Sequence, residues 1–343
     1  MININEMTVL LVDDMPNMIN SIQKILKILG FGRIFLHAGN GEEALRTLRK
    51  QPVDMAIIDY DMPVMTGVEC LREIREDRDL RDLPVIMVTA NTERDFVMEV
   101  AEAEVNDYIL KPVTIKTLEN KIPLVIEEAN NPPPMVYHLR KARQFEEEGR
   151  IDDALNETLA AVEADPKSSR PVRDTGYYYL KKGDLKEAEK WLYRAAKMNT
   201  LDVFAFHHLG SLYLALNNIE KALYYFEKAI KISPRHLTRN VQFGKTLIAQ
   251  KAVDKAIKIF ERTFKLSDSP IRLKEEIADF CISSGANEYA SSLLESIIRD
   301  QPNRTDLSMK LDNTLKKIYD QKEGGNPLYN SDKTHFTAEN AVC

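Results

Sequence analysis

The segment Ala56-Ile57-Ile58-Asp59-Tyr60-Asp61-Met62-Pro63 decides the fold of the first third of the chain. A short apolar run ends at a carboxylate, and turn-forming residues follow it. Such a run is typical of a fully buried central strand. Asp59 would then lie at the carboxyl end of that strand, where open α/β sheets place their ligands. Taken alone, the segment fits an ordinary strand that ends in an aspartate. Whether Asp59 belongs to a functional site therefore depends on the neighbouring segments.

Strands and helices are predicted to alternate through residues 1–130. Asn40, with Glu43 three residues later, is expected to cap the second helix. This alternation predicts right-handed βαβ units and a five-stranded, doubly wound parallel sheet. Strand-like apolar runs stand at 8–12, 33–38, 55–59, 83–89 and 108–110, and segments with helical spacing begin at about 16, 40, 68, 92 and 115.

Polar side chains follow the predicted strands. Asp13 and Asp14 come after the first strand, Asp59 ends the third, Thr89 ends the fourth and Lys111 follows the fifth. Because parallel strands end at the same edge of a sheet, these groups should converge. Three carboxylates packed together repel one another, and a bound Mg²⁺, which prefers carboxylates, waters and phosphoryl oxygens, would relieve that repulsion. Asp59 is then the expected nucleophile toward phosphorus, with Thr89 and Lys111 binding the phosphoryl oxygens.

Four motifs stand at these strand ends: Leu11-Val12-Asp13-Asp14, Ile58-Asp59-Tyr60-Asp61-Met62-Pro63, Val88-Thr89-Ala90 and Tyr108-Ile109-Leu110-Lys111-Pro112. By the order and spacing of these motifs, residues 7–130 resemble the receiver domain of two-component response regulators, which has a flavodoxin-like fold. The resemblance implies that Asp59 accepts a phosphoryl group from a histidine kinase or a phosphotransfer protein. It implies that Asp13, Asp14, Asp59 and the backbone carbonyl of Asp61 hold Mg²⁺, and that Thr89 and Tyr108 form the switch.

Two positions depart from that family's pattern. Glu104 and Val105 stand where small residues are usual, just before the Asn-Asp-Tyr run. Pro123 falls inside the predicted last helix of the domain, where a proline removes a hydrogen bond and costs about 3 kcal/mol, so a kink or break is expected. Both positions lie on the face through which the family usually signals, so the resemblance does not carry over to the output surface.

The rest of the chain repeats itself with a period of 34 residues. The helix-breaking segment 131–135 predicts a linker before the repeats. A period of 34 with small residues at fixed places predicts antiparallel helix pairs stacked into an all-α superhelix. It resembles the tetratricopeptide repeat, with five units over 136–303, a capping helix at 304–321 and a disordered tail at 322–343. The repeated alanines are Ala154, Ala188, Ala222, Ala256 and Ala290.

In the tetratricopeptide family the first helix of each pair lines a concave peptide-binding groove. Laid on this sequence, that pattern predicts a basic and aromatic face, for which an acidic peptide or acidic protein surface is the expected ligand. A face that is merely solvated, with no dedicated ligand, is the alternative. The residues brought towards the groove are Arg170, Arg173, Tyr177, Lys181, Phe204, His207, Ser211, Thr238 and Lys245.

Composition and charge indicate a globular protein and disfavour a membrane protein or a nucleic-acid-binding first domain. With 44% hydrophobic and 29% charged residues the chain reads as globular, and no apolar run approaches the roughly 18 residues that span a bilayer. Three scattered cysteines and the absence of a secretory pattern fit the cytoplasm. Residues 1–131 hold 14 Lys and Arg against 23 Asp and Glu, which argues against nucleic acid binding there.

We therefore expect a bacterial response regulator whose output module is a protein-binding solenoid. The alternative is a phosphorylation-independent scaffold in which the receiver is only a docking domain. Specific nucleic acid binding is disfavoured because no recognition-helix module or strongly basic stretch is present. The only chemistry that the pocket suggests is self-phosphorylation and self-dephosphorylation. The sequence leaves open the cognate kinase, the downstream partner and the sign of regulation.

Overall fold

The computed structural model describes residues 1–90, 103–234, 236–267 and 269–323. Contacts divide the chain into two compact units, Met1–Ser233 and Pro234–Cys343. The predicted helix at 92–103, apart from Ala103, and most of the predicted tail lie outside the described residues. None of the described helices combines the length and the apolar content that crossing a bilayer requires.

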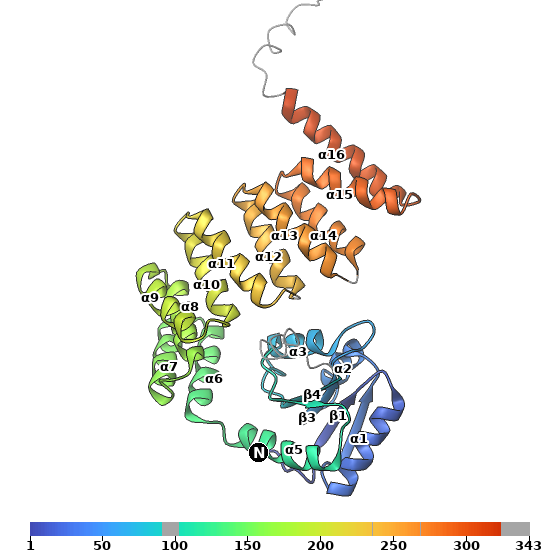
Figure 1. The fold of residues 1–343 in the computed structure, drawn as a ribbon, viewed down its shortest axis with the longest axis vertical. Helices are drawn as coiled ribbons and strands as arrows, with labels where there is room; N and C mark the ends of the chain where they lie inside the picture. The colour runs from blue at the N-terminus through green and yellow to red at the C-terminus, as the bar shows by residue number, and fades with distance from the viewer. Residues whose placement is uncertain (91–102, 235, 268, 324–343) are drawn as a thin grey trace, which may run out of the picture. The chain divides into compact units, whose positions relative to one another are not determined.

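The first domain is a five-stranded parallel sheet, as predicted, with the strand order β2-β1-β3-β4-β5. The middle strand β3 (Met55–Asp59) is buried along its whole length. Helices α1 (Pro16–Leu29) and α5 (Ile115–Asn130) pack on one face of the sheet. Helices α2 (Gly41–Leu48) and α3 (Gly67–Glu76) cover the other face (Figure 1). The remaining strands are β1 (Thr8–Val12), β2 (Ile34–Ala38), β4 (Val85–Thr89) and β5 (Asp107–Leu110).

Local signals in the sequence explain where these helices begin and end. The side chain of Asn40 accepts a hydrogen bond from the Glu43 backbone N–H (3.0 Å), and the Glu43 carboxylate accepts one from Gly39, which confirms the predicted cap. Helix α5 runs without interruption from Ile115 to Asn130, so the break expected at Pro123 does not occur. An apolar stripe of α5, including Leu118 and Ile122, is fully buried against the sheet. That packing outweighs the hydrogen bond lost at the proline.

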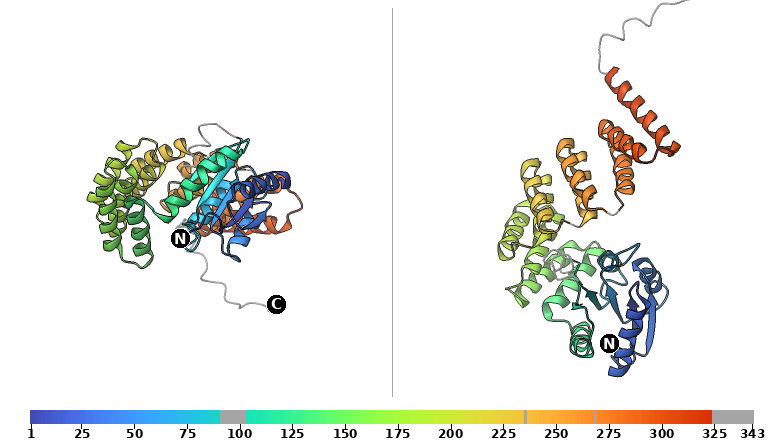
Figure 2. Two further views of the ribbon diagram at one scale, coloured as in Figure 1. Left: turned by 90° about the horizontal axis from the view of Figure 1, so that it is seen from below. Right: turned by 45° about the vertical axis from the view of Figure 1, so that its right-hand side comes forward.

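After the sheet domain, every regular element in the described residues is a helix. Helix α5 ends at Asn130 and the next helix already begins at Pro134, so only three residues connect them. The first unit holds α6 (Pro134–Glu147), α7 (Ile151–Ala164), α8 (Ser169–Lys182), α9 (Leu185–Met198), α10 (Val203–Ala215) and α11 (Ile219–Ile232). The second unit holds α12 (Leu237–Ala249), α13 (Val253–Leu266), α14 (Pro270–Ser283), α15 (Asn287–Asp300) and α16 (Thr305–Glu323). Figure 2 shows these helix pairs in two further views.

The period of 34 has a packing cause at the crossing of the two helices in a pair. The Cβ of an alanine placed at Gly210 would lie 2.2 Å from the ring of Phe226, and the same distance separates such a Cβ at Gly244 from the ring of Phe260. Both members of this contact recur after 34 residues. A glycine on the first helix therefore makes room for an aromatic ring on the second, and the repeated alanines are fully buried in the same way.

Candidate functional site

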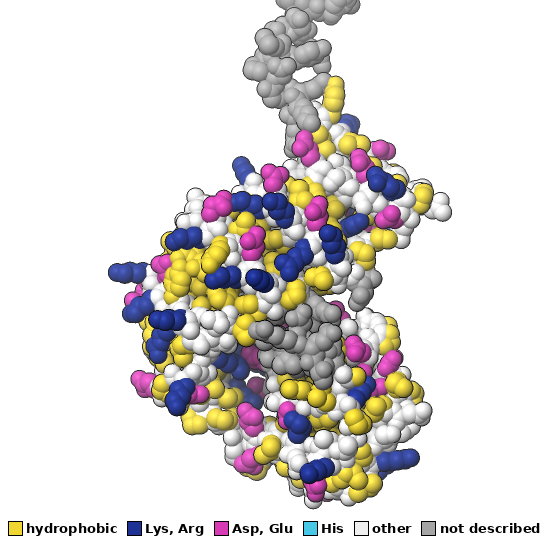
Figure 3. Space-filling view, viewed as in Figure 1, with side chains coloured by type: hydrophobic (Ala, Val, Ile, Leu, Met, Phe, Trp, Pro, Cys, Tyr) yellow, Lys and Arg dark blue, Asp and Glu magenta, His cyan; other side chains and the backbone are white. Residues whose placement is uncertain are grey.

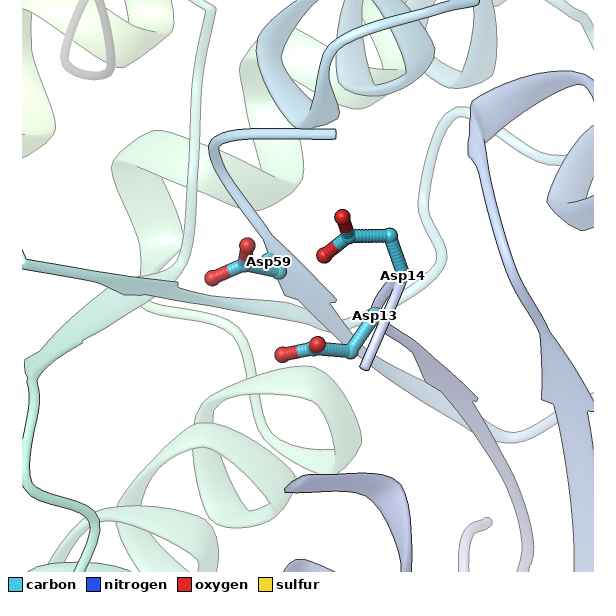
Figure 4. Close-up of side chains that lie close together, drawn as sticks. All are labelled: Asp13, Asp14 and Asp59. Atoms are coloured by element: carbon cyan, nitrogen blue, oxygen red, sulfur yellow. The ribbon is translucent and has the colours of Figure 1, made fainter. Parts of the chain in front are cut away.

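Three carboxylates meet at the carboxyl edge of the sheet. Asp13 and Asp14 follow β1, and Asp59 is the last residue of the neighbouring strand β3 (Figure 4). One oxygen from each lies within 4.8 Å of the others. Asp13 and Asp59 are buried, whereas Asp14 is exposed. The convergence expected from the strand ends is therefore present.

Lys111 supplies the balancing positive charge. Its Nζ lies 2.7 Å from Asp59 Oδ1 and 3.7 Å from Asp13 Oδ2. The position of Lys111 is fixed by its backbone N–H, which donates to the carbonyl of Thr89 at the end of β4 (2.7 Å). Lys111 therefore bridges the ends of three strands.

Burial and repulsion between carboxylates raise the pKa of two groups of the pocket, Asp59 and Asp13. Burial, followed by the charge of Asp13, raises the pKa of Asp59 to about 6 although Lys111 opposes the shift. Burial raises the pKa of Asp13 as well. Burial would lower the pKa of Lys111, but the hydrogen bond and charge of Asp59 raise it above its usual value. At neutral pH Asp59 is thus ionised, with the Lys111 ammonium as its ion-pair partner.

The donor set fits a hard divalent cation. Asp13 Oδ1 accepts a hydrogen bond from the Met15 backbone N–H (2.8 Å), which fixes the carboxylate, while the buried Oδ2 accepts none. A buried carboxylate oxygen without a hydrogen bond is costly unless a cation coordinates it. Asp13, Asp14 and Asp59 are the groups that would hold Mg²⁺, and receiver domains bind Mg²⁺ at such a pocket.

The remaining predicted pocket residues lie around this cluster. Thr89 is buried at the end of β4, and Asp61 is exposed two residues after Asp59. Gly67 is packed so closely that a Cβ there would lie 2.0 Å from the backbone oxygen of Asp59, which explains why the loop after β3 needs a glycine. Tyr108 on β5 is 37% exposed, with Lys121 Nζ 5.8 Å from its ring centroid. Tyr108 thus presents an outward ring, and its switch role and the Asp61 carbonyl ligand remain predictions.

Glu104, noted in the sequence only as a departure from the family's pattern, joins the sheet domain to the first repeats. Its carboxylate pairs with Arg170 of α8 (2.9 Å) and Arg143 of α6 (3.4 Å). Burial would raise the pKa of Glu104, but Arg170 and Arg143 lower it below its usual value. Further ion pairs join Arg78 to Glu147 of α6 (3.2 Å) and Arg81 to the same carboxylate. These contacts explain why the compact unit extends past the predicted domain boundary at 131–135 to Ser233.

Most side chains of the predicted groove already have partners within the protein. Each of their lysines and arginines is paired with a carboxylate: Arg170 with Glu104, Arg173 with Asp174 (2.7 Å), Lys181 with Glu146 (2.5 Å) and Lys245 with Glu276 (2.6 Å). Tyr177 donates to Glu146 (2.6 Å), Phe204 lies beneath the Arg173 guanidinium, and Ser211 donates to the His207 carbonyl. Thr238 is exposed, and burial lowers the pKa of His207 to about 4, so that this side chain is neutral. An acidic ligand for this face stays a prediction.

Comparisons with known proteins agree with both halves of this description. Residues 9–123 match the response regulator receiver domain, and residues 139–202 and 203–236 match tetratricopeptide repeat families. Chemotaxis protein CheY of Pseudomonas aeruginosa is 41% identical over 124 residues, which are 36% of this chain and 99% of that protein. Chemotaxis protein CheY-3 of Vibrio cholerae is 40% identical over 121 residues, 35% and 92% of the two chains.

A solved structure, that of the chemotaxis response regulator CheY4 of Vibrio cholerae, is 28% identical to this chain with a TM-score of 0.33. The alignment covers 35% of this chain and 98% of the CheY4 chain. The motifs, the pocket and the curated relatives lead to one assignment. The chain belongs to the response regulators of two-component signalling, with a receiver domain followed by tetratricopeptide repeats.

Proposed function

We propose that Asp59 accepts a phosphoryl group, with Mg²⁺ held by Asp13, Asp14 and Asp59, and that this event switches protein contacts made by the repeats. The observation that carries the proposal is the cluster at the sheet edge. A buried nucleophile on the middle strand lies 2.7 Å from a lysine ammonium and beside a buried Asp13 oxygen that accepts no hydrogen bond. The donor would be a histidine kinase or a phosphotransfer protein, as for receiver domains in general.

The pocket's residues have distinct roles in that transfer. At neutral pH Asp59 is ionised, so a carboxylate oxygen can form a bond to phosphorus while the bond between phosphorus and the donor's imidazole nitrogen breaks. The electron pair of the broken bond stays on the imidazole, which takes up a proton. Lys111 then pairs with a phosphoryl oxygen in place of the Asp59 oxygen, and the Thr89 hydroxyl donates to another. Mg²⁺ held by Asp13, Asp14 and Asp59 would neutralise charge that develops on the transferred group.

Glu104 supplies a route from the pocket to the repeats. It stands four residues before Tyr108 in the segment that enters β5, the strand that Lys111 follows directly. A shift of β5 that accompanies a change at Lys111 would move the carboxylate that pairs with α6 and α8. Phosphorylation would thereby bias an existing equilibrium between attached and released repeats.

Intact-protein mass spectrometry after incubation with a small phosphodonor and Mg²⁺ tests the acceptor. We expect a mass increase of one phosphoryl group in the wild-type chain and in Asp79→Asn, an exposed control, and none in Asp59→Asn. An unchanged wild-type mass with every donor, or a phosphorylated Asp59→Asn chain, contradicts the proposal.

A scaffold that works without phosphorylation is the second candidate, favoured by the ion pairs that already fix the receiver to α6 and α8. Capture of partners by the wild-type chain and by Asp59→Ala, each with and without phosphodonor, separates the two. Equal recovery in all four conditions supports the scaffold, and recovery that changes only in phosphorylated wild type supports the switch.

A further inference from the structure

An apolar pocket of about 380 Å³ lies between α9, α10 and α11. Its floor is made by buried side chains, Phe206 and Leu209 of α10 and Tyr225 of α11. The more exposed Tyr193 of α9 stands at its side, and the Tyr193 hydroxyl is 2.7 Å from that of Tyr225. A pocket of this size, with an apolar floor and a few hydroxyl groups, falls within the range of ligand sites.

Positive charge surrounds this pocket. Lys197, Lys228 and Lys231 are among the residues that line it, and no Asp or Glu is among them. Within the described part of the chain none of these three lysines forms an ion pair, in contrast to the lysines and arginines of the predicted groove. Lys228 Nζ lies 5.2 Å from the ring centroid of Phe206, over the floor. Figure 3 shows hydrophobic side chains gathered over α9–α11 with Lys and Arg around them.

The pocket is separate from the predicted concave groove. The groove residues of α10 are Phe204, His207 and Ser211, which share one face at helical spacing. Phe206 and Leu209 lie on a different face of the same helix. A ligand here would not compete with one that fills the groove.

We propose that this pocket, lined by α9–α11, docks a partner protein segment in which a bulky apolar side chain is flanked by carboxylates. The apolar floor would bury the side chain, and the unpaired lysines would pair with the carboxylates at the rim. A concave pocket suits one inserted side chain better than a membrane surface, which contacts protruding apolar groups. The proposal rests on the repeats being a binding module, and does not require phosphorylation of Asp59.

Fluorescence anisotropy with a labelled peptide that carries Phe between Asp and Glu residues tests the pocket on the full-length chain. We expect saturable binding that weakens with salt and that is absent for the same peptide with Lys in place of Asp and Glu. Lys228→Ala with Lys231→Ala should weaken binding roughly two- to thirty-fold, since each exposed ion pair contributes modestly. Thr200→Trp, at an exposed lining position, should block the pocket.

The matched control is Lys186→Ala with Lys190→Ala, which removes the same charge from exposed positions of α9 outside the pocket. Circular dichroism of each variant shows whether it is folded. The proposal is overturned if no acidic peptide with Phe, Leu, Tyr or Trp binds, or if the control weakens binding equally. Lysine-dependent binding to anionic vesicles without peptide binding, or self-association through the pocket, overturns it as well. Phosphorylation of Asp59 can succeed or fail independently of these outcomes.

Discussion

Replacing Asp59 by asparagine should stabilise the metal-free protein although it removes the phosphoacceptor. In the folded state the pKa of Asp59 is about 6, against 3.8 for an unperturbed aspartate. At about 1.4 kcal/mol per pKa unit, ionised Asp59 costs the fold up to about 3 kcal/mol at neutral pH. Part of this cost is screened where the pocket is open to water. We therefore expect Asp59→Asn to raise the free energy of unfolding by about 1–3 kcal/mol.

The pH dependence follows from the sign of the shift. Because folding raises the pKa of Asp59, its destabilising effect is fully present above pH 6 and disappears as the pH falls from about 6 towards 3.8. The difference between wild type and Asp59→Asn should shrink over the same interval. Mg²⁺ should also reduce the difference, since it stabilises the wild-type pocket in proportion to its occupancy.

Urea unfolding in the presence of EDTA at pH 7.5 and pH 5 measures these differences. The exposed control Asp79→Asn should change stability by less than about 0.5 kcal/mol at both pH values. An Asp59→Asn chain that is no more stable than wild type in EDTA at pH 7.5 would refute the claim that burial and the charge of Asp13 make ionised Asp59 destabilising.

Three further substitutions test other parts of the structure. Gly67→Ala should lower the free energy of unfolding by more than about 3 kcal/mol and abolish stabilisation by Mg²⁺, because the new Cβ would lie 2.0 Å from the backbone oxygen of Asp59. Thermal unfolding with and without Mg²⁺ measures both effects. Gly210→Ala should cost about 1–3 kcal/mol in urea unfolding, because its Cβ would overlap the ring of Phe226. Glu104→Gln should leave two arginines uncompensated and speed amide exchange in α6, read by hydrogen–deuterium exchange.

Matched controls exist for each of these changes. Gly39→Ala places a Cβ 3.4 Å from a flexible carboxylate and should cost less than Gly67→Ala or Gly210→Ala. Glu119→Gln removes an exposed carboxylate of α5 and should leave exchange in α6 unchanged. If the glycine variants all match Gly39→Ala, or if Glu104→Gln matches Glu119→Gln, the close packing and the ion-pair link described above are wrong.

The sheet and its pocket were predictable because their signals are local. The strand β3 is a continuous apolar run, and the parallel sheet follows from the alternation of strands and helices. Once the strands are parallel, their last residues must share an edge, which brings Asp13, Asp59 and Lys111 together. The repeats were predictable from the period alone, since each unit uses the same small residues at the helix crossings.

The contacts between residues far apart in the sequence could not be predicted from local patterns. Glu104 gave only a negative signal, a residue too large for its position, and its arginine partners lie 39 and 66 residues further on. The basic groove looked open because the sequence places Arg173 and Lys181 on one face, but does not show that carboxylates of other segments neutralise them. A kink or break is the local expectation at Pro123, but α5 is not broken there, because tertiary packing of that helix overrides the local preference.

Hydrogen–deuterium exchange of the repeats with and without phosphorylation shows whether the state of Asp59 is coupled to α6. The wild-type chain and Asp59→Asn would be incubated with a small phosphodonor and Mg²⁺, and exchange would be followed across Pro134–Glu147. If phosphorylation of Asp59 switches the repeats, exchange in α6 changes in the phosphorylated wild type and stays constant in Asp59→Asn. A fully phosphorylated wild-type chain whose exchange in α6 equals that of the unphosphorylated chain would contradict the proposed coupling.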